Sequence, residues 1–197
     1  MRNGDRHFFG GSWRRAAGTL GVLAFAVAII AIARRADGNP PGVGQSRAEI
    51  EDLAFCYAAG TDAIARGDVQ GGKAIYQGCF TSDAVVKAYL PTSDPNGPPD
   101  ISGIGPDGWG DTVEATFTGA GYTGTQHLMG NIRIHIQGNT ATMTSYLTAT
   151  HVLQPFTTID LATGTYDDVV VHTPAGWRIA QRTLRILTFQ RVQSPSP

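Results

Sequence analysis

The sequence lacks an excess of charge of either sign. Its 197 residues include 15 lysines and arginines against 16 aspartates and glutamates, so the formal net charge is −1. A domain that binds nucleic acid normally presents a basic surface, and this composition supplies none. The length suits one domain plus an extension. We therefore expect a single folded domain with no nucleic-acid partner.

Cysteine is also scarce. Cys56 and Cys79 are the only two, and their spacing fits neither a zinc site nor a Cys-x-x-Cys redox motif. We accordingly predict no metal site. The simplest interpretation is a pair of small buried hydrophobic side chains. If the domain is exported, a disulfide between them is the alternative.

Charge is absent from residues 16–33, an apolar run of about 18 residues with Arg14-Arg15 before it and Arg34-Arg35 after it. Such a run is barely long enough to cross a bilayer and is longer than most signal-peptide cores. It is either an uncleaved membrane anchor with the domain outside the cytoplasm, which its length and basic flank favour, or an export signal. The predicted organisation is a leader over 1–36, a linker over 37–45, a folded domain over 46–192 and a tail over 193–197.

Apolar periodicity predicts helices first and strands afterwards. A capping box of Ser46 and Glu49 would open a helix that ends at Gly67, and Asp68 would cap the next one. A third helix follows Pro106. The remaining predictions are a strand over 84–90, a loop from 91 to 105, a hairpin over 125–153 and strands over 164–172 and 177–192. This order predicts an α+β fold in which a curved antiparallel sheet wraps over the helices and encloses a pocket.

The hairpin carries two histidines. Side chains alternate between the two faces of a strand, and Gly138-Asn139 between the two runs is typical of a tight turn. In the second run the threonines occupy one face, and His151 falls on the opposite, less polar face. His127 would share the polar face of the first run, but a bulge at Gly130-Asn131 reverses the facing. We therefore expect both histidines to point into the pocket.

Asp62, late in the first helix, completes a set that can transfer protons. A carboxylate bonded to one imidazole nitrogen fixes the tautomer and raises the basicity of the other nitrogen. A second histidine could serve the opposite end of a substrate. Removing a proton next to a carbonyl also needs a hydrogen-bond donor for the oxyanion. The candidate donors and pocket residues are Tyr57, Tyr89, Tyr146, Tyr166 and Trp109.

The motif Thr125-Gln-His-Leu-Met-Gly-Asn131, followed by an inward histidine one strand later, resembles the SnoaL-like branch of the NTF2-like superfamily. That branch includes polyketide cyclases and scytalone dehydratase. The resemblance covers about residues 45–192 and implies a cone-shaped fold, a homodimer and no cofactor. It assigns proton transfer to His127 and His151, with Asp62 as their partner. Thr61 departs from the dehydratase pattern, which has a tyrosine there, so the resemblance does not extend to that substrate.

Two functions from different classes are consistent with these residues. The first is a cofactor-independent dehydratase, isomerase or cyclase that acts on a small apolar molecule with a carbonyl group. The second is a non-catalytic, membrane-tethered domain that binds a ligand or another protein. One fold hosts many functions, so only the site can decide between them.

Overall fold

The computed structural model describes residues 42–193. The predicted leader over 1–36, linker residues 37–41 and tail residues 194–197 lie outside the described residues. None of the described helices combines the length and the apolar character needed to span a membrane.

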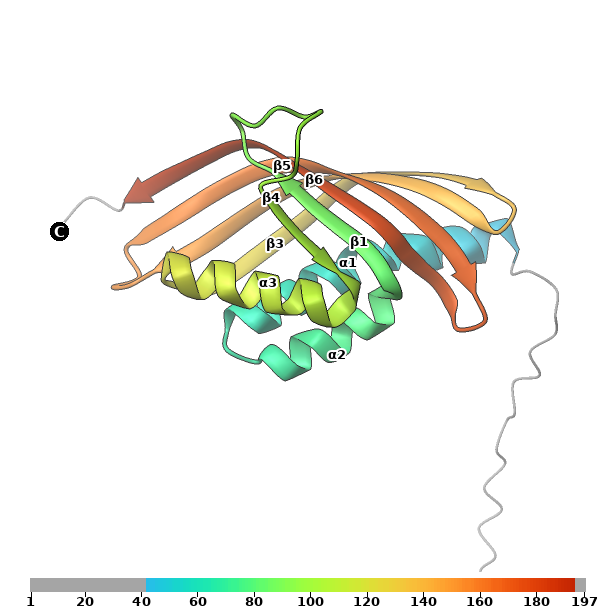
Figure 1. Cartoon of the computed structure of the whole chain (residues 1–197), viewed down its shortest axis with the longest axis horizontal. Coiled ribbons are helices and arrows are strands. Elements are labelled where there is room, and N and C mark those ends of the chain that lie inside the picture. The colour runs from blue at the N-terminus through green and yellow to red at the C-terminus, as the bar shows by residue number, and fades with distance from the viewer. Residues whose placement is uncertain (1–41, 194–197) are drawn as a thin grey trace, which may run out of the picture. The chain divides into compact units, whose positions relative to one another are not determined.

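Three helices lie on one side of a single curved sheet, which arches over them (Figure 1). The helices are α1 (Val43–Ala65), α2 (Val69–Cys79) and α3 (Gly105–Ala120). The strands are β1 (Phe80–Tyr89), β2 (Ile101–Ile104), β3 (Tyr122–Gln137), β4 (Thr140–Leu153), β5 (Thr158–Thr173) and β6 (Gly176–Gln193). The predicted α+β fold with a sheet wrapped over helices is confirmed.

The sheet order is β2-β1-β6-β5-β4-β3. The predicted antiparallel meander from β3 to β6 is confirmed. Two features were not predicted: β1 pairs in parallel with β6, and β2 interrupts the segment that was expected to be a loop. In addition, β5 begins at Thr158, six residues before the predicted start. Pairing between distant segments leaves no local pattern, because the partners are set by how the chain folds back on itself.

The predicted start of the first helix is wrong. Gly42 is the N-cap of α1, with no side-chain cap, and the amide of Ser46 donates to the Gly42 carbonyl oxygen at 2.9 Å. Ser46 therefore lies one turn inside the helix, where it is buried, and it does not occupy the N-cap position that the predicted capping box requires. Residues 43–45 belong to α1, although the sequence placed them in the linker.

The connection between α1 and α2 follows the sequence closely. Gly67 has a φ of 90°, which a glycine adopts without a side-chain clash, and Asp68 accepts a hydrogen bond from the amide of Gly71. Cys56 of α1 and Cys79 at the end of α2 form a disulfide. The alternative interpretation of the two cysteines is therefore confirmed, and the disulfide fixes α2 against the helix that carries Asp62.

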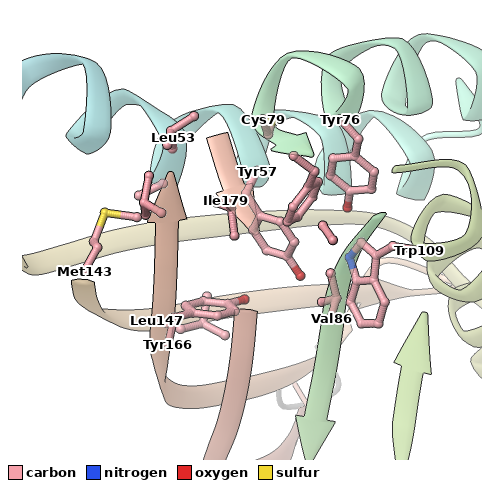
Figure 2. Close-up of a cluster of buried hydrophobic side chains, with 14 of the residues drawn as sticks. Leu53, Tyr57, Tyr76, Cys79, Val86, Trp109, Met143, Leu147, Tyr166 and Ile179 are labelled. Carbon is pink, nitrogen blue, oxygen red and sulfur yellow. The ribbon is translucent and has the colours of Figure 1, made fainter. Parts of the chain in front are cut away.

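The hydrophobic core fills the space between the helices and the concave face of the sheet. Figure 2 shows side chains of this core from both layers, among them Leu53 and Tyr57 of α1 and Met143 and Leu147 of β4. The rings of Tyr57 and Tyr166 are 5.4 Å apart between centroids. The buried face of β4 is the one predicted, since Ala141, Met143, Ser145, Leu147, Ala149 and His151 are buried and most of the intervening side chains are exposed. One part of this interior remains open and forms the site described next.

Candidate active site

The bulge in β3 determines which way His127 points. The β3–β4 register shifts between Gly130 and Arg133, and Asn131 has a φ of 48°. A first irregularity lies between Tyr122 and Gly124, and from Thr125 to the second shift the odd-numbered side chains of β3, including His127, are the ones that point inward. After it Ile132, Ile134 and Ile136 are the more buried ones. One extra residue therefore reverses the facing, as the sequence predicted.

His127 is held by Asp62. Its Nδ1 lies 2.7 Å from Asp62 Oδ1, and its backbone amide donates to Asp62 Oδ2 at 3.2 Å. Thr125 Oγ1 donates to Asp62 Oδ1 at 2.7 Å. Thr125 and His127 are two residues apart in a strand, so both face the helix and together hold one carboxylate.

Asp62 is ionised in this environment. Burial opposes its charge, but the hydrogen bonds from His127 and Thr125 outweigh burial and hold the pKa of the Asp62 carboxyl below its usual range. An ionised carboxylate can only accept a hydrogen bond, so Nδ1 of His127 donates to it and Nε2 is the ring nitrogen left for other contacts. The side chain of His127 is 5% exposed, so the ring is held by its surroundings as well as by Asp62.

His151 is held differently. Its Nδ1 lies 3.2 Å from the backbone carbonyl oxygen of Asp160. Burial, and then the proximity of His127, lower the pKa of His151. Its ring stands nearly perpendicular to that of His127, with 5.8 Å between the ring centroids. The site thus pairs a carboxylate-backed histidine with one that stays neutral.

Both histidines line a cavity of about 640 Å³ between the sheet and helices α1 and α3. Trp109, Val113 and Phe117 of α3 form one wall. Within residues 42–193, the side chains that line the cavity are apolar, aromatic, threonine or histidine, and none is a carboxylate, lysine or arginine. The cavity therefore suits an uncharged, largely apolar ligand.

The remaining predicted residues divide into two groups. Tyr57, Tyr166 and Trp109 line the cavity, whereas Asp62 lies behind His127 and contacts its ring. Tyr146 was wrongly predicted as a pocket residue, because it is 57% exposed on the opposite face of β4. Tyr89 does not line the cavity either, and its hydroxyl donates to the Gly97 carbonyl oxygen at 3.4 Å.

A second polar group beside His151 was missed. Tyr122 packs against the His151 ring at 4.8 Å between centroids and donates its hydroxyl proton to Asp160 Oδ2 at 2.8 Å. Arg191 holds both oxygens of Asp160 at 2.8 Å. Asp160 faces His151 across β4 and β5 and faces Arg191 across β5 and β6. The β5–β6 register shifts twice between this pair and the turn, so locating β5 in the sequence would not by itself have paired Asp160 with Arg191.

Comparison with known proteins identifies the family. The SnoaL-like domain matches residues 44–183, which is most of the chain. The chain belongs to the SnoaL-like domain family. The resemblance drawn from the two histidines and Asp62 is therefore confirmed at the level of the family.

Solved structures agree with this SnoaL-like assignment. Kfla4162 from Kribbella flavida is 22% identical over 76% of this chain and 95% of its own, with a TM-score of 0.60. A protein from Novosphingobium aromaticivorans, provisionally named a scytalone dehydratase, is 23% identical over 78% and 90%, with a TM-score of 0.56. The hexachlorocyclohexane dehydrochlorinase LinA-type3 from Novosphingobium barchaimii is 16% identical over 78% and 96%, with a TM-score of 0.59. At these identities the likeness establishes the NTF2-like fold. No curated protein sequence matches the chain.

Proposed function

We propose that this SnoaL-like domain is a cofactor-independent acid–base enzyme of the lyase or isomerase type, acting on a small apolar molecule with a carbonyl group. The observation that carries the proposal is the 2.7 Å contact between Asp62 and His127 at the wall of an apolar cavity. A half-buried carboxylate that holds one imidazole nitrogen leaves the other ready to remove a proton. Two structural relatives are named for eliminations, a dehydratase and a dehydrochlorinase, which supports this class of reaction.

His127 is the base in this proposal. Its Nε2 takes a proton from the carbon next to the carbonyl, and the electron pair of the broken C–H bond moves into a new C=C bond while charge develops on the oxygen. The imidazolium that forms is stabilised by ionised Asp62. Neutral His151, 5.8 Å away between ring centroids, lies on the same wall and can exchange a proton at a second position of the ligand.

Deuterium exchange tests the proposal without knowledge of the natural substrate. The full-length chain is incubated in D₂O with neutral cyclic ketones such as 1-tetralone, and loss of the α-proton signal is followed by NMR. Binding is followed in parallel by the change in tryptophan fluorescence, to which Trp109 contributes because it lines the cavity. We expect exchange to be faster with the wild-type chain than with His127→Gln. If the wild-type chain and His127→Gln gave equal exchange rates with every ketone that binds, the proposal would be contradicted and a non-catalytic ligand-binding domain would be favoured.

We further infer that the domain functions outside the cytoplasm, tethered by residues 16–33 or exported by them. The Cys56–Cys79 disulfide supports this inference, since such bonds persist mainly in oxidising compartments. To test this inference, the chain is purified from its native cells and alkylated with and without prior reduction. Mass spectrometry then counts the cysteines that have reacted. Both cysteines should react only after reduction. Free thiols in the untreated chain would contradict the inference.

A further inference from the structure

A second carboxylate lies beside the second histidine, and an arginine binds both of its oxygens. Asp160 of β5 is 2% exposed. Arg191 of β6 donates from Nε to Asp160 Oδ1 and from Nη2 to Oδ2, each at 2.8 Å. Tyr122 of β3 donates its hydroxyl proton to the same Oδ2 at 2.8 Å. Neither Asp160 nor Arg191 lines the cavity, so both affect a ligand through the side chains that do, Tyr122 and His151.

The register of the sheet brings these groups to His151. His151 lies directly opposite Asp160 across β4 and β5, and Asp160 lies directly opposite Arg191 across β5 and β6. Residues opposite one another on paired strands share a face of the sheet. From β3, the Tyr122 ring packs 4.8 Å from the His151 ring between centroids, and its hydroxyl reaches over β4 to Asp160. Burial and the hydrogen bond to Asp160 raise the pKa of Tyr122, so its hydroxyl stays uncharged.

The charge of Arg191 determines how Asp160 affects His151. The hydrogen bonds from Arg191 outweigh burial and hold the pKa of the Asp160 carboxyl below its usual range, so Asp160 is ionised. A bare carboxylate beside an imidazole favours the imidazolium. Because Arg191 binds both oxygens, the ion pair presents no net charge to His151. Asp62, in contrast, has no lysine or arginine partner among residues 42–193, and its charge stays available to His127.

The other side chains around His151 add little charge. His127 of β3 faces it at 5.8 Å between ring centroids, and Asp62 of α1 lies behind His127. Phe117 of α3 and Phe189 of β6 pack against the ring and carry no charge. In the proposed reaction His127 takes up a proton, and an imidazolium at His151 would oppose this second positive charge. An uncharged His151 therefore favours proton transfer to His127.

We propose that Arg191 is a positioning residue of the site, which pairs with Asp160 and thereby keeps His151 uncharged while His127 takes up a proton. This inference rests on the proposed function and deepens it. Arg191 does not line the cavity, so it acts through Asp160 and not by touching a ligand. Its side chain is 59% exposed, so a polar, uncharged replacement is compatible with the fold.

Titration of the His151 ring tests this role without any ligand. The imidazole signals of the full-length chain are followed by NMR against pH, and His151→Gln identifies those of His151. Arg191→Gln removes the charge but keeps a donor for Asp160, and it should move the midpoint of the His151 titration to higher pH. Arg191→Lys restores the charge and should bring the midpoint back toward the wild-type value. Arg133→Gln makes the same change at an exposed position of β3 and should leave the midpoint unchanged.

Two further variants separate charge from packing. Asp160→Asn keeps an oxygen that accepts from Tyr122 but leaves Arg191 as an unpaired cation, so alone it should move the His151 midpoint to lower pH. Combined with Arg191→Gln, it should cancel the upward shift. Tyr122→Phe keeps the ring on His151 and removes only an uncharged donor, so its shift should be smaller than that of Arg191→Gln.

An unchanged or lower His151 midpoint in Arg191→Gln would overturn the proposal. So would an upward shift that persists when Asp160→Asn is added, or an unchanged midpoint in Asp160→Asn alone. The titration needs no ketone, so its failure is separable from failure of the proposed proton transfer, which is measured by exchange. A chain that shows these shifts but exchanges no ketone protons would support the charge balance at His151 and contradict the proposed function.

Discussion

His127 and His151 share one cavity wall, yet they are held in opposite ways. His127 contacts a carboxylate, Asp62 Oδ1, at 2.7 Å, whereas His151 contacts a backbone carbonyl oxygen, that of Asp160, at 3.2 Å. A carboxylate stabilises an imidazolium by charge, and a carbonyl dipole does so far less. Burial and the neighbouring His127 lower the pKa of His151, which keeps that ring neutral. Two identical side chains are thus prepared for different roles.

The two supports also come from different layers of the molecule. Asp62 belongs to α1, so its contact with His127 depends on how the helix docks against β3. The partner of His151 belongs to β5, the strand beside it in the sheet. The position of the His127 ring therefore depends on tertiary packing, whereas the position of the His151 ring depends on the pairing of β4 with β5.

The largest effect is expected from replacing each histidine by glutamine. His127→Gln removes the base and should slow exchange of tetralone α-protons by about 10²- to 10⁴-fold. His151→Gln should slow it by no more than about tenfold, since solvent can return the proton that His151 would supply. Exchange rates followed by NMR at saturating ketone check both. A greater loss in His151→Gln than in His127→Gln would reverse the assigned roles.

The second effect concerns the disulfide. Replacing Cys56 and Cys79 by alanine removes a cross-link between α1 and the end of α2, and we expect a loss of about 2–4 kcal/mol in the free energy of unfolding. Urea unfolding measures it, with the oxidised wild-type chain as reference. Because α1 carries Asp62, the Nδ1 proton signal of His127 in the folded variant should broaden as its contact loosens, and that of His151 should stay as it is. Equal broadening of both signals would show that the two histidines do not depend on different parts of the fold for their support.

A smaller loss is expected from Asp62→Asn. The amide keeps the size of the carboxylate but loses its charge, so His127 remains in place and its protonated form is less stable. Residues that support a functional histidine typically contribute about 10- to 100-fold, and we expect exchange to slow by that factor. Asp83→Asn, at an exposed position of β1, is the matched control and should leave the rate unchanged. A rate for Asp62→Asn equal to that of the control would remove Asp62 from the mechanism.

The sequence was sufficient to place both histidines. Strict alternation along β4 put His151 inside, and the Gly130-Asn131 bulge was needed to turn His127 inward. The same alternation would have excluded Tyr146, which follows buried Ser145, and Tyr89, which follows buried Ala88. Those two predictions were wrong because tyrosine chemistry was considered without the face of the strand.

Other features left no local signal. Arg182 lies in a strand where a charged side chain suggests solvent, and it is buried because Asp168 is its neighbour across β5 and β6. Asp160 and Arg191 meet only through the register of the same two strands. The parallel pairing of β1 with β6 joins segments about a hundred residues apart. Such contacts are set by topology, which one sequence without its fold does not reveal.

The smallest expected effect is on the pH dependence of the free energy of unfolding. His151 and Asp62 should affect it in different pH ranges. The folded chain holds the pKa of His151 below its ordinary value of 6.5, so the unfolded chain takes up the proton more readily. Stability should therefore fall as pH drops below about 6.5, and His151→Gln should remove that part of the fall.

The lowered pKa of Asp62 makes a contribution that is complete above its ordinary value of 3.8 and is lost only below it. Asp62→Asn should consequently remove the fall in stability that this carboxyl causes below about pH 3.8. Urea unfolding at a series of pH values measures the slope of the unfolding free energy against pH, with His135→Gln, at an exposed position, as the control. If His151→Gln gave the same slope as the control, the two histidines would not be held as differently as their contacts indicate.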